Sequence, residues 1–229
     1  MDDTHKFQRV TAIAAILALP AAWGGLIIGL MAVGYDFEVF SDTHTLIAIG
    51  SEAANLIRWS LILAMFGNYL LLIPLALFLW HWLRPHSPLY ATFYTLGGLM
   101  YIFLGAMGGA IMTVVWPLLI NEFAQAPEAQ KETLVMLFQV ITRLAEGGFQ
   151  GALQNIPGGI WFLGMGLLLR QERRMLGYYD VIVGFFLLVN ALGGILQSEP
   201  LSMIGLTANL LLVPVWAMWL GLELLRKHI

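Results

Sequence analysis

The chain has 229 residues, of which 59% are hydrophobic and only 11% are charged, and its net charge is −3 at pH 7. Soluble domains carry about 25% charged residues, so this composition indicates a protein whose solvent is lipid. The small, scattered net charge argues against nucleic acid as a partner. The absence of cysteine excludes disulfides, thiolate metal sites, iron–sulfur clusters and covalent haem attachment.

Six apolar segments are long enough to cross a membrane, which requires roughly 20 residues per helix. They cover residues 10–34, 57–83, 91–120, 148–169, 176–197 and 201–225. The first contains 25 uncharged residues from Val10 to Gly34, too many for a signal-peptide core, so we expect it to be retained as a span. We predict an all-α polytopic membrane bundle of six transmembrane helices that forms one domain over residues 1–229.

Two amphipathic stretches, 43–56 and 133–147, precede the second and fourth spans, and we expect them to extend those helices beyond the membrane. Ser51 is a plausible N-cap for a helix that begins there. Proline removes a backbone donor inside a span and can kink it. We expect the sharpest break in the fourth span at the IPGG sequence, residues 156–159.

The distribution of lysine and arginine predicts the orientation of the bundle. With the N-terminus inside, the inner segments contain eight of the eleven cations, namely Lys6, Arg9, Arg84, Arg170, Arg173, Arg174, Arg226 and Lys227. The outer segments contain only Arg58, Lys131 and Arg143. This positive-inside bias predicts that both termini are cytoplasmic.

Polar side chains recur along the fourth helix at α-helical spacing. Gln139, Arg143, Glu146, Gln150 and Gln154 follow one another at intervals of 4, 3, 4 and 4 residues, which places them on one stripe of an α-helix. In this topology, amide side chains of four spans lie in or near the outer half of the membrane: Gln150, Gln154, Asn155, Asn68, Asn190 and Asn209. Polar side chains avoid lipid, so we expect these amides to converge inside the bundle. They either line a polar pocket open to the outside or join helices through hydrogen bonds.

Charged residues lead into the second and fourth spans. Arg143 and Glu146 are three residues apart and can pair along a helix, while Glu52 and Arg58 occupy the start of the second helix. Our hypothesis is that Glu52, Arg58, Arg143 and Glu146 form a charged network at the outer mouth of the bundle. The alternative is four separate interfacial charges.

No catalytic or metal-binding signature is evident. His81 is the only histidine within a span, flanked by Trp80 and Trp82, which is typical of an aromatic belt. Asp180 lies a few residues into the fifth span near Arg173 and Arg174, and we expect it to reach the cytoplasmic surface. The chain has no HExxH, GxSxG or P-loop sequence. The sequence therefore predicts no metal and no cofactor.

Two stretches resemble a known family. SEAANLIR at 51–58 and LIPLALFLWHWLRP at 72–85 are similar to an uncharacterised bacterial six-helix integral membrane family, described only as a domain of unknown function. The matching elements are Glu52, Arg58, Leu75-Ala76-Leu77, Leu83-Arg84-Pro85 and, at the fifth helix, Arg173, Arg174, Leu176 and Gly177. The resemblance implies a six-helix fold in a bacterial cytoplasmic membrane, and it implies no activity.

Three functions remain open from the sequence. The first is non-enzymatic binding or passage of a small neutral or amphipathic molecule, including a lipid, through an outward-facing polar pocket. The second is an accessory subunit of a larger membrane assembly or a homo-oligomer, indicated by glycine pairs spaced four apart such as Gly25 and Gly29. The third is an enzyme acting on lipid, with Glu146 or Glu52 as its base.

Overall fold

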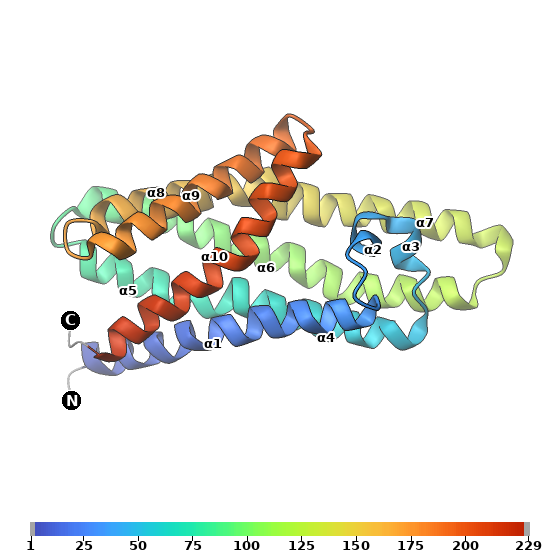
Figure 1. The fold of residues 1–229 in the computed structure, drawn as a ribbon, viewed down its shortest axis with the longest axis horizontal. Coiled ribbons are helices and arrows are strands. Elements are labelled where there is room, and N and C mark those ends of the chain that lie inside the picture. The colour runs from blue at the N-terminus through green and yellow to red at the C-terminus, as the bar shows by residue number, and fades with distance from the viewer. Residues whose placement is uncertain (1–2, 227–229) are drawn as a thin grey trace.

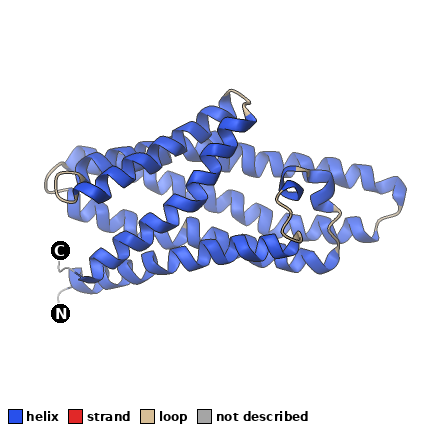
Figure 2. Cartoon of the chain, viewed as in Figure 1, coloured by secondary structure: helices blue, strands red, loops and turns tan. Residues whose placement is uncertain are grey.

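The computed structural model describes residues 3–226, and that part of the chain is helical without a strand (Figure 2). In chain order the elements are α1 (Asp3–Ala32), α2 (Glu38–Ser41), α3 (Thr43–Ile47), α4 (Ser51–Asn68), the 3₁₀ turn η1 (Leu70–Leu72), α5 (Ile73–Leu83), α6 (Pro88–Gln125), α7 (Glu128–Thr142), the π-helical segment η2 (Arg143–Leu153), α8 (Gln154–Leu169), α9 (Arg174–Ile195) and α10 (Glu199–Arg226).

Within residues 3–226, six helical segments are long and apolar enough to cross a membrane. They are Asp3–Ala32, Ser51–Leu83, Pro88–Gln125, Glu128–Leu169, Arg174–Ile195 and Glu199–Arg226. The second combines α4, η1 and α5, and the fourth combines α7, η2 and α8. The predicted all-α fold with six membrane-length helices is confirmed.

The six segments close a ring in chain order. α1 packs against α4, α4 against α6, α6 against α8, α8 against α9, and α9 against α10, which returns to α1. Figure 1 shows that α1 begins and α10 ends at the same end of the bundle, which we call the terminal end. The opposite end, where α6 turns into α7, is the distal end. Side chains on the inner faces of this ring can therefore meet on a common axis.

Glycine allows the closest helix approach in the ring. A Cβ atom on Gly67 of α4 would lie 2.2 Å from the backbone nitrogen of Ala22 and 2.7 Å from the carbonyl oxygen of Ala18, both on α1. Gly25 of α1 packs in the same way against the backbone of Ser60 and Ala64 in α4. Small residues at such positions let backbones approach closely inside a membrane. One of the glycine pairs noted in the sequence thus serves packing within the chain.

The distal end projects beyond the rest of the bundle. α6 has 38 residues, about 57 Å at 1.5 Å per residue, nearly twice the roughly 30 Å of a hydrocarbon core. In Figure 1, α6 and α7 extend past the turn between α9 and α10, and α2 and α3 lie beside them. A second hydrophobic core fills this end, including Leu46 of α3, Trp116 of α6 and Phe138 of α7. The indole nitrogen of Trp116 donates a buried hydrogen bond to Thr142 Oγ1 at 3.0 Å.

The predicted extensions of two spans differ in outcome. The stretch 133–147 does extend the fourth span, because α7 and η2 run directly into α8. The predicted extension of the second span over 43–56 holds for residues 51–56, which begin α4, and is wrong for 43–50, because α3 ends at Ile47 and α4 begins at Ser51. Gly50 interrupts the helix with a φ of 94°, a left-handed conformation that glycine adopts without a steric penalty. Gly50 is also the N-cap, so Ser51 is the first helical residue instead of the cap.

Candidate functional site

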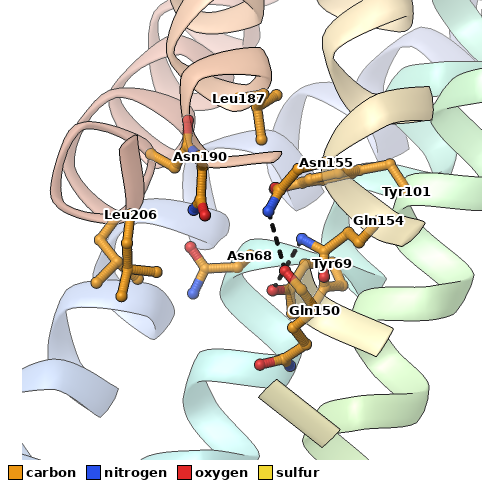
Figure 3. A pocket seen from close by; sticks show the side chains of 11 residues that line it. Asn68, Tyr69, Tyr101, Gln150, Gln154, Asn155, Leu187, Asn190 and Leu206 are labelled. Carbon is orange, nitrogen blue, oxygen red and sulfur yellow. Dashed lines mark hydrogen bonds between the residues drawn. The ribbon is translucent and has the colours of Figure 1, made fainter. Parts of the chain in front are cut away.

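A small cavity lies on the ring axis, between the core at the terminal end and the core at the distal end. Its volume is about 50 Å³. The lining residues come from every long helical segment except α1: Asn68, Tyr69, Tyr101, Gln150, Gln154, Asn155, Leu187, Asn190, Leu206, Asn209 and Leu210. All six amide residues singled out from the sequence are among them. Figure 3 shows Asn68, Gln154, Asn155 and Asn190 directed toward a common space.

Hydrogen bonds hold part of this lining in place. The amide nitrogen of Gln154 donates to the Tyr69 hydroxyl at 3.2 Å, and that of Asn155 donates to the backbone oxygen of Gln150 at 3.0 Å (Figure 3). The side chain of Gln150 donates to the backbone oxygen of Gly105 on α6 at 2.9 Å. Asn68 bonds within its own helix, to Ala64 O at 3.0 Å. Two of the four bonds, from Gln154 to Tyr69 and from Gln150 to Gly105, therefore join different membrane-length segments.

Other polar atoms of the lining are buried without a partner. They are Oε1 of Gln154 and both amide atoms, Nδ2 and Oδ1, of Asn209. Gln154 is only 4% exposed and Asn209 only 8% exposed. A buried polar group without a hydrogen bond costs about 1–3 kcal/mol. These three atoms therefore provide one donor and two acceptors for something bound in the cavity.

Two breaks in the helices shape the cavity. Between α4 and α5 the chain leaves the helix at Tyr69 (φ −134°, ψ −69°), which directs the phenol ring across to α6. There the ring packs on Gly105, where a Cβ atom would lie 2.2 Å from it. In the fourth span, η2 is broken at Gly151, whose ψ of −124° is not helical. π-helical turns often occur at functional sites.

The expected break at IPGG is wrong in position. Pro157 lies within the first turns of α8, and the helix instead breaks at Gly151, one and a half turns earlier. Proline cannot donate to the preceding turn, so the backbone ahead of it must find other partners. For Pro157 the carbonyl concerned is that of Leu153, whereas the Asn155 side chain donates to the backbone oxygen of Gln150, next to the break at Gly151.

The π-helical segment also divides the predicted polar stripe. Arg143 and Glu146 are exposed on the surface, whereas Gln150 and Gln154 turn toward the cavity. A π-helix bonds residue i to i+5 and turns less per residue than an α-helix, so a stripe at α-helical spacing does not stay on one face. Gln150 and Gln154 are the only members of the stripe that line this cavity.

The four charged residues do not pair with one another. Glu52, Arg58, Arg143 and Glu146 are all exposed, and within residues 3–226 no ion pair of 4.0 Å or less joins any two of them. Glu52 and Arg58 are six residues apart and so face different sides of α4. None of the four lines the cavity.

Aromatic side chains close the cavity toward the terminal end. Tyr101, which lines the cavity, packs on Trp161 and Phe162 with ring centroids 6.2 and 6.1 Å apart. Trp161 and Phe162 in turn contact Trp216 of α10 at 5.8 and 4.8 Å. The rings of Trp161, Phe162 and Trp216 are 1% exposed. We call these four residues the aromatic floor.

Sequence reasoning missed Tyr69 and Tyr101. Both rings are next to glycines of the neighbouring helix, Gly105 and Gly158. A glycine opposite an aromatic residue in an adjacent span was the available signal, but it requires knowing which helices touch.

Comparison with known proteins identifies the family. Residues 8–227 match the model of a family described as "Domain of unknown function (DUF4386)". The chain belongs to the DUF4386 family. This confirms the resemblance to an uncharacterised membrane family. Neither the search of curated proteins nor the search of solved structures found a match.

The polar lining of the site in this DUF4386 chain consists of groups that form hydrogen bonds. Among residues 3–226, no group of three or more histidine, aspartate or glutamate side chains could hold a metal ion. The lining of the cavity consists of carboxamides, phenols and leucines, which are uncharged. What the cavity can do chemically is donate and accept hydrogen bonds.

The expectation that Asp180 of this DUF4386 chain reaches the surface is wrong. Asp180 is 0% exposed, and neither carboxylate oxygen has a hydrogen-bond partner. The indole nitrogen of Trp216 faces this carboxylate but is also without a hydrogen bond of normal geometry. Gly166 on α8 makes room for Asp180, since a Cβ atom there would lie 2.7 Å from that of Asp180.

Replacing Asp180 by asparagine is expected to leave the free energy of unfolding unchanged or to raise it by up to about 2 kcal/mol. The amide costs less to bury than a carboxylate, and its oxygen can still face the indole N–H of Trp216. Thermal unfolding in detergent measures the change, with Glu132→Gln on the exposed face of α7 as the control. A loss of more than about 1 kcal/mol would mean that Asp180 has a stabilising partner.

Proposed function

We propose that this protein binds a small, neutral, hydrogen-bonding molecule in the cavity on the ring axis. The observation that carries the proposal is the set of three buried amide atoms of Gln154 and Asn209 without partners. They call for a ligand that donates to two oxygens and accepts from one nitrogen. No charged group lines the cavity, so a neutral ligand is favoured over an ion.

The size of the cavity limits the ligand. A single water needs about 10–15 Å³ of such volume, so the roughly 50 Å³ here suits a molecule of a few non-hydrogen atoms or a small water cluster. Drug-sized ligands occupy about 300–1,000 Å³, which argues against a lipid at this position. The aromatic floor supports binding over open passage, because buried rings fill the space toward the terminal end.

A panel of small neutral molecules tests the proposal. Urea, formamide, acetamide and glycerol would each be titrated against the purified protein, with the unfolding temperature as readout. A ligand at 100 times its Kd adds about 2.7 kcal/mol to the free energy of unfolding. We expect at least one panel member to stabilise the wild type, and Asn209→Leu to abolish that effect.

The control for this experiment is Asn55→Leu. Asn55 is exposed on α4 and does not line the cavity, so the variant should keep the full ligand effect. Either of two results would refute the proposal: no panel member stabilises the wild type, or the stabilisation persists in Asn209→Leu.

We also propose that both termini face the cytoplasm of a bacterial cell, in its cytoplasmic membrane, which puts the distal end outside. The excess of lysine and arginine in the segments at the terminal end supports this orientation. The absence of cysteine makes the test direct. Thr43→Cys on α3 is expected to react with a membrane-impermeant maleimide added to intact cells, and His86→Cys is expected to react only after lysis. If His86→Cys reacted in intact cells and Thr43→Cys reacted only after lysis, the orientation would be the opposite of the proposed one.

A second candidate function is that of an accessory subunit in a membrane assembly. It is favoured by the apolar surface of the projecting distal end, where Met136, Val140 and Leu144 are exposed on one face of α7 and η2. Native mass spectrometry after gentle extraction distinguishes the two functions. Other chains at fixed stoichiometry would support the subunit, and a single chain would count against it.

A further inference from the structure

A second cavity lies at the terminal end, far along the bundle from the first. Its volume is about 320 Å³, within the 300–1,000 Å³ typical of ligand sites. It is formed where the connection from α8 to α9 approaches the ends of α5 and α10. The lining residues are Trp82, Glu172, Arg173, Arg174, Met175, Leu176, Trp219, Leu220 and Glu223. We call this cavity the basal groove.

The basal groove contains two arginines and two glutamates, which do not pair with each other in the described part of the chain. Neither Arg173 nor Arg174 has a carboxylate within 4.0 Å among residues 3–226. Glu172 Oε1 lies 3.5 Å from His86 Nδ1, and Glu223 also has a partner. The guanidinium of Arg174 lies 5.8 Å from the centre of the Tyr178 ring and within reach of the Tyr178 hydroxyl, and with five N–H donors it can bind an anion as well.

Apolar surface in the groove lies next to these cations. Trp82 and Trp219 are half-buried, with Trp82 against Phe78 at 6.2 Å and Trp219 against Tyr179 at 5.8 Å between ring centroids. Leu176 and Leu220 add buried aliphatic surface. Tryptophan is enriched where hydrocarbon meets headgroups. The groove therefore combines an anion-binding side with an apolar side at the end of the spans.

We propose that the basal groove binds an anionic phospholipid, with Arg173 and Arg174 holding its phosphate and the two indoles contacting the glycerol and the first carbons of the acyl chains. Guanidinium groups bind phosphate oxygens through paired hydrogen bonds. Basic pockets between helices at a membrane surface bind lipid headgroups. Because neither arginine forms an ion pair with a carboxylate among residues 3–226, we expect an anionic lipid to be preferred over a zwitterionic one.

Retention of lipid after reconstitution tests the proposal. The full chain would be reconstituted into vesicles of equal parts phosphatidylglycerol and phosphatidylcholine, then extracted gently and weighed by native mass spectrometry. The expected result is one phosphatidylglycerol per chain. In the double variant Arg173→Gln/Arg174→Gln the bound fraction should fall about tenfold. Unchanged retention in a folded double variant overturns the proposal.

The control variant removes the same number of positive charges as the double variant, but from positions outside the groove. Arg84→Gln/Arg226→Gln lies at the same end, and Arg84 contacts the Trp80 ring at 4.9 Å instead of the groove. This variant should retain phosphatidylglycerol as the wild type does. If it also lost about tenfold of the bound lipid, retention would depend on general surface charge, and the proposed site would be incorrect. If the double variant does not fold, Arg173→Gln and Arg174→Gln are measured singly. Each should lower retention about threefold, and retention equal to wild type in both contradicts the proposal.

A soluble anion is the other source of a phosphate group. Inorganic phosphate and glycerol phosphate would be added at millimolar concentration during extraction. Since the indoles contribute to lipid binding, neither is expected to displace phosphatidylglycerol. If either compound displaced phosphatidylglycerol and was itself detected bound to the chain, the groove would bind soluble phosphate, and the proposal of a lipid ligand would be wrong.

Discussion

Replacing Gly67 by alanine is expected to lower the free energy of unfolding by about 3 kcal/mol, at the upper end of the cost of overpacking. The new Cβ atom would lie 2.2 Å from Ala22 N, 2.6 Å from Ala22 Cα and 2.7 Å from Ala18 O. All three are backbone atoms of a helix, so no side chain can rotate to relieve the collision. α1 and α4 would have to separate, which disturbs two neighbouring interfaces of the ring. Unfolding by denaturant in detergent micelles measures the loss.

Gly24→Ala is the matched control. Gly24 belongs to α1 and has no atom within 4 Å of the position of a Cβ. Alanine favours the helix over glycine by up to about 1 kcal/mol, so this variant should equal or exceed the wild type in stability. If Gly67→Ala were as stable as Gly24→Ala, the close contact of α1 and α4 would be incorrect.

Trp161→Ala is expected to cost about 4 kcal/mol, the range for deleting a fully buried aromatic side chain. Trp161 is 1% exposed and contacts Tyr101, Phe162 and Trp216 with ring centroids 4.6–6.2 Å apart. Its removal leaves a void in the middle of the aromatic floor. Unfolding in micelles again gives the free energy.

Two substitutions serve as comparisons for the Trp161 variant. Trp23→Ala removes a 38% exposed indole on α1 and should cost less than half as much. Trp161→Phe keeps an aromatic ring and deletes an indole N–H that has no hydrogen-bond partner, so it should also cost far less than alanine. Equal losses for Trp161→Ala and Trp23→Ala would mean that the aromatic floor is not tightly packed.

The number of helices and the amide positions could be predicted because both depend on local composition. Asn68, Asn190 and Asn209 each interrupt an apolar run, and a polar side chain in such a run avoids lipid whichever neighbours it has. The structure places these three side chains on one cavity with Gln150, Gln154 and Asn155. Their use as a ligand site is a proposal that the ligand panel addresses.

Features that depend on backbone geometry could not be predicted from spacing alone. The grouping of Arg143 and Glu146 with Gln150 assumed α-helical periodicity, and η2 does not have it. The continuous helix over 43–56 failed at Gly50, because glycine is compatible with both a helix and a left-handed turn.

Burial of Asp180 depends on a contact between helices that are distant in sequence. The nearby Arg173 and Arg174 suggested a carboxylate at the surface. The side chain instead points toward α8 and α10, where Gly166 leaves space beside Trp216. Sequence separation gives the depth of a residue in the membrane but not the direction it faces.

The ring in chain order has a consequence for how the protein is assembled during synthesis. Each new helix that enters the membrane finds its ring neighbour already there, since that neighbour is the preceding span. Only the seam between α1 and α10 must wait for the last helix. Gln8 Nε2 bonds to Leu224 O across this seam at 2.8 Å, and the backbone at Gly221 lies against Ala12. Closure of the whole bundle, including the cavity on its axis, is therefore the final step of membrane insertion.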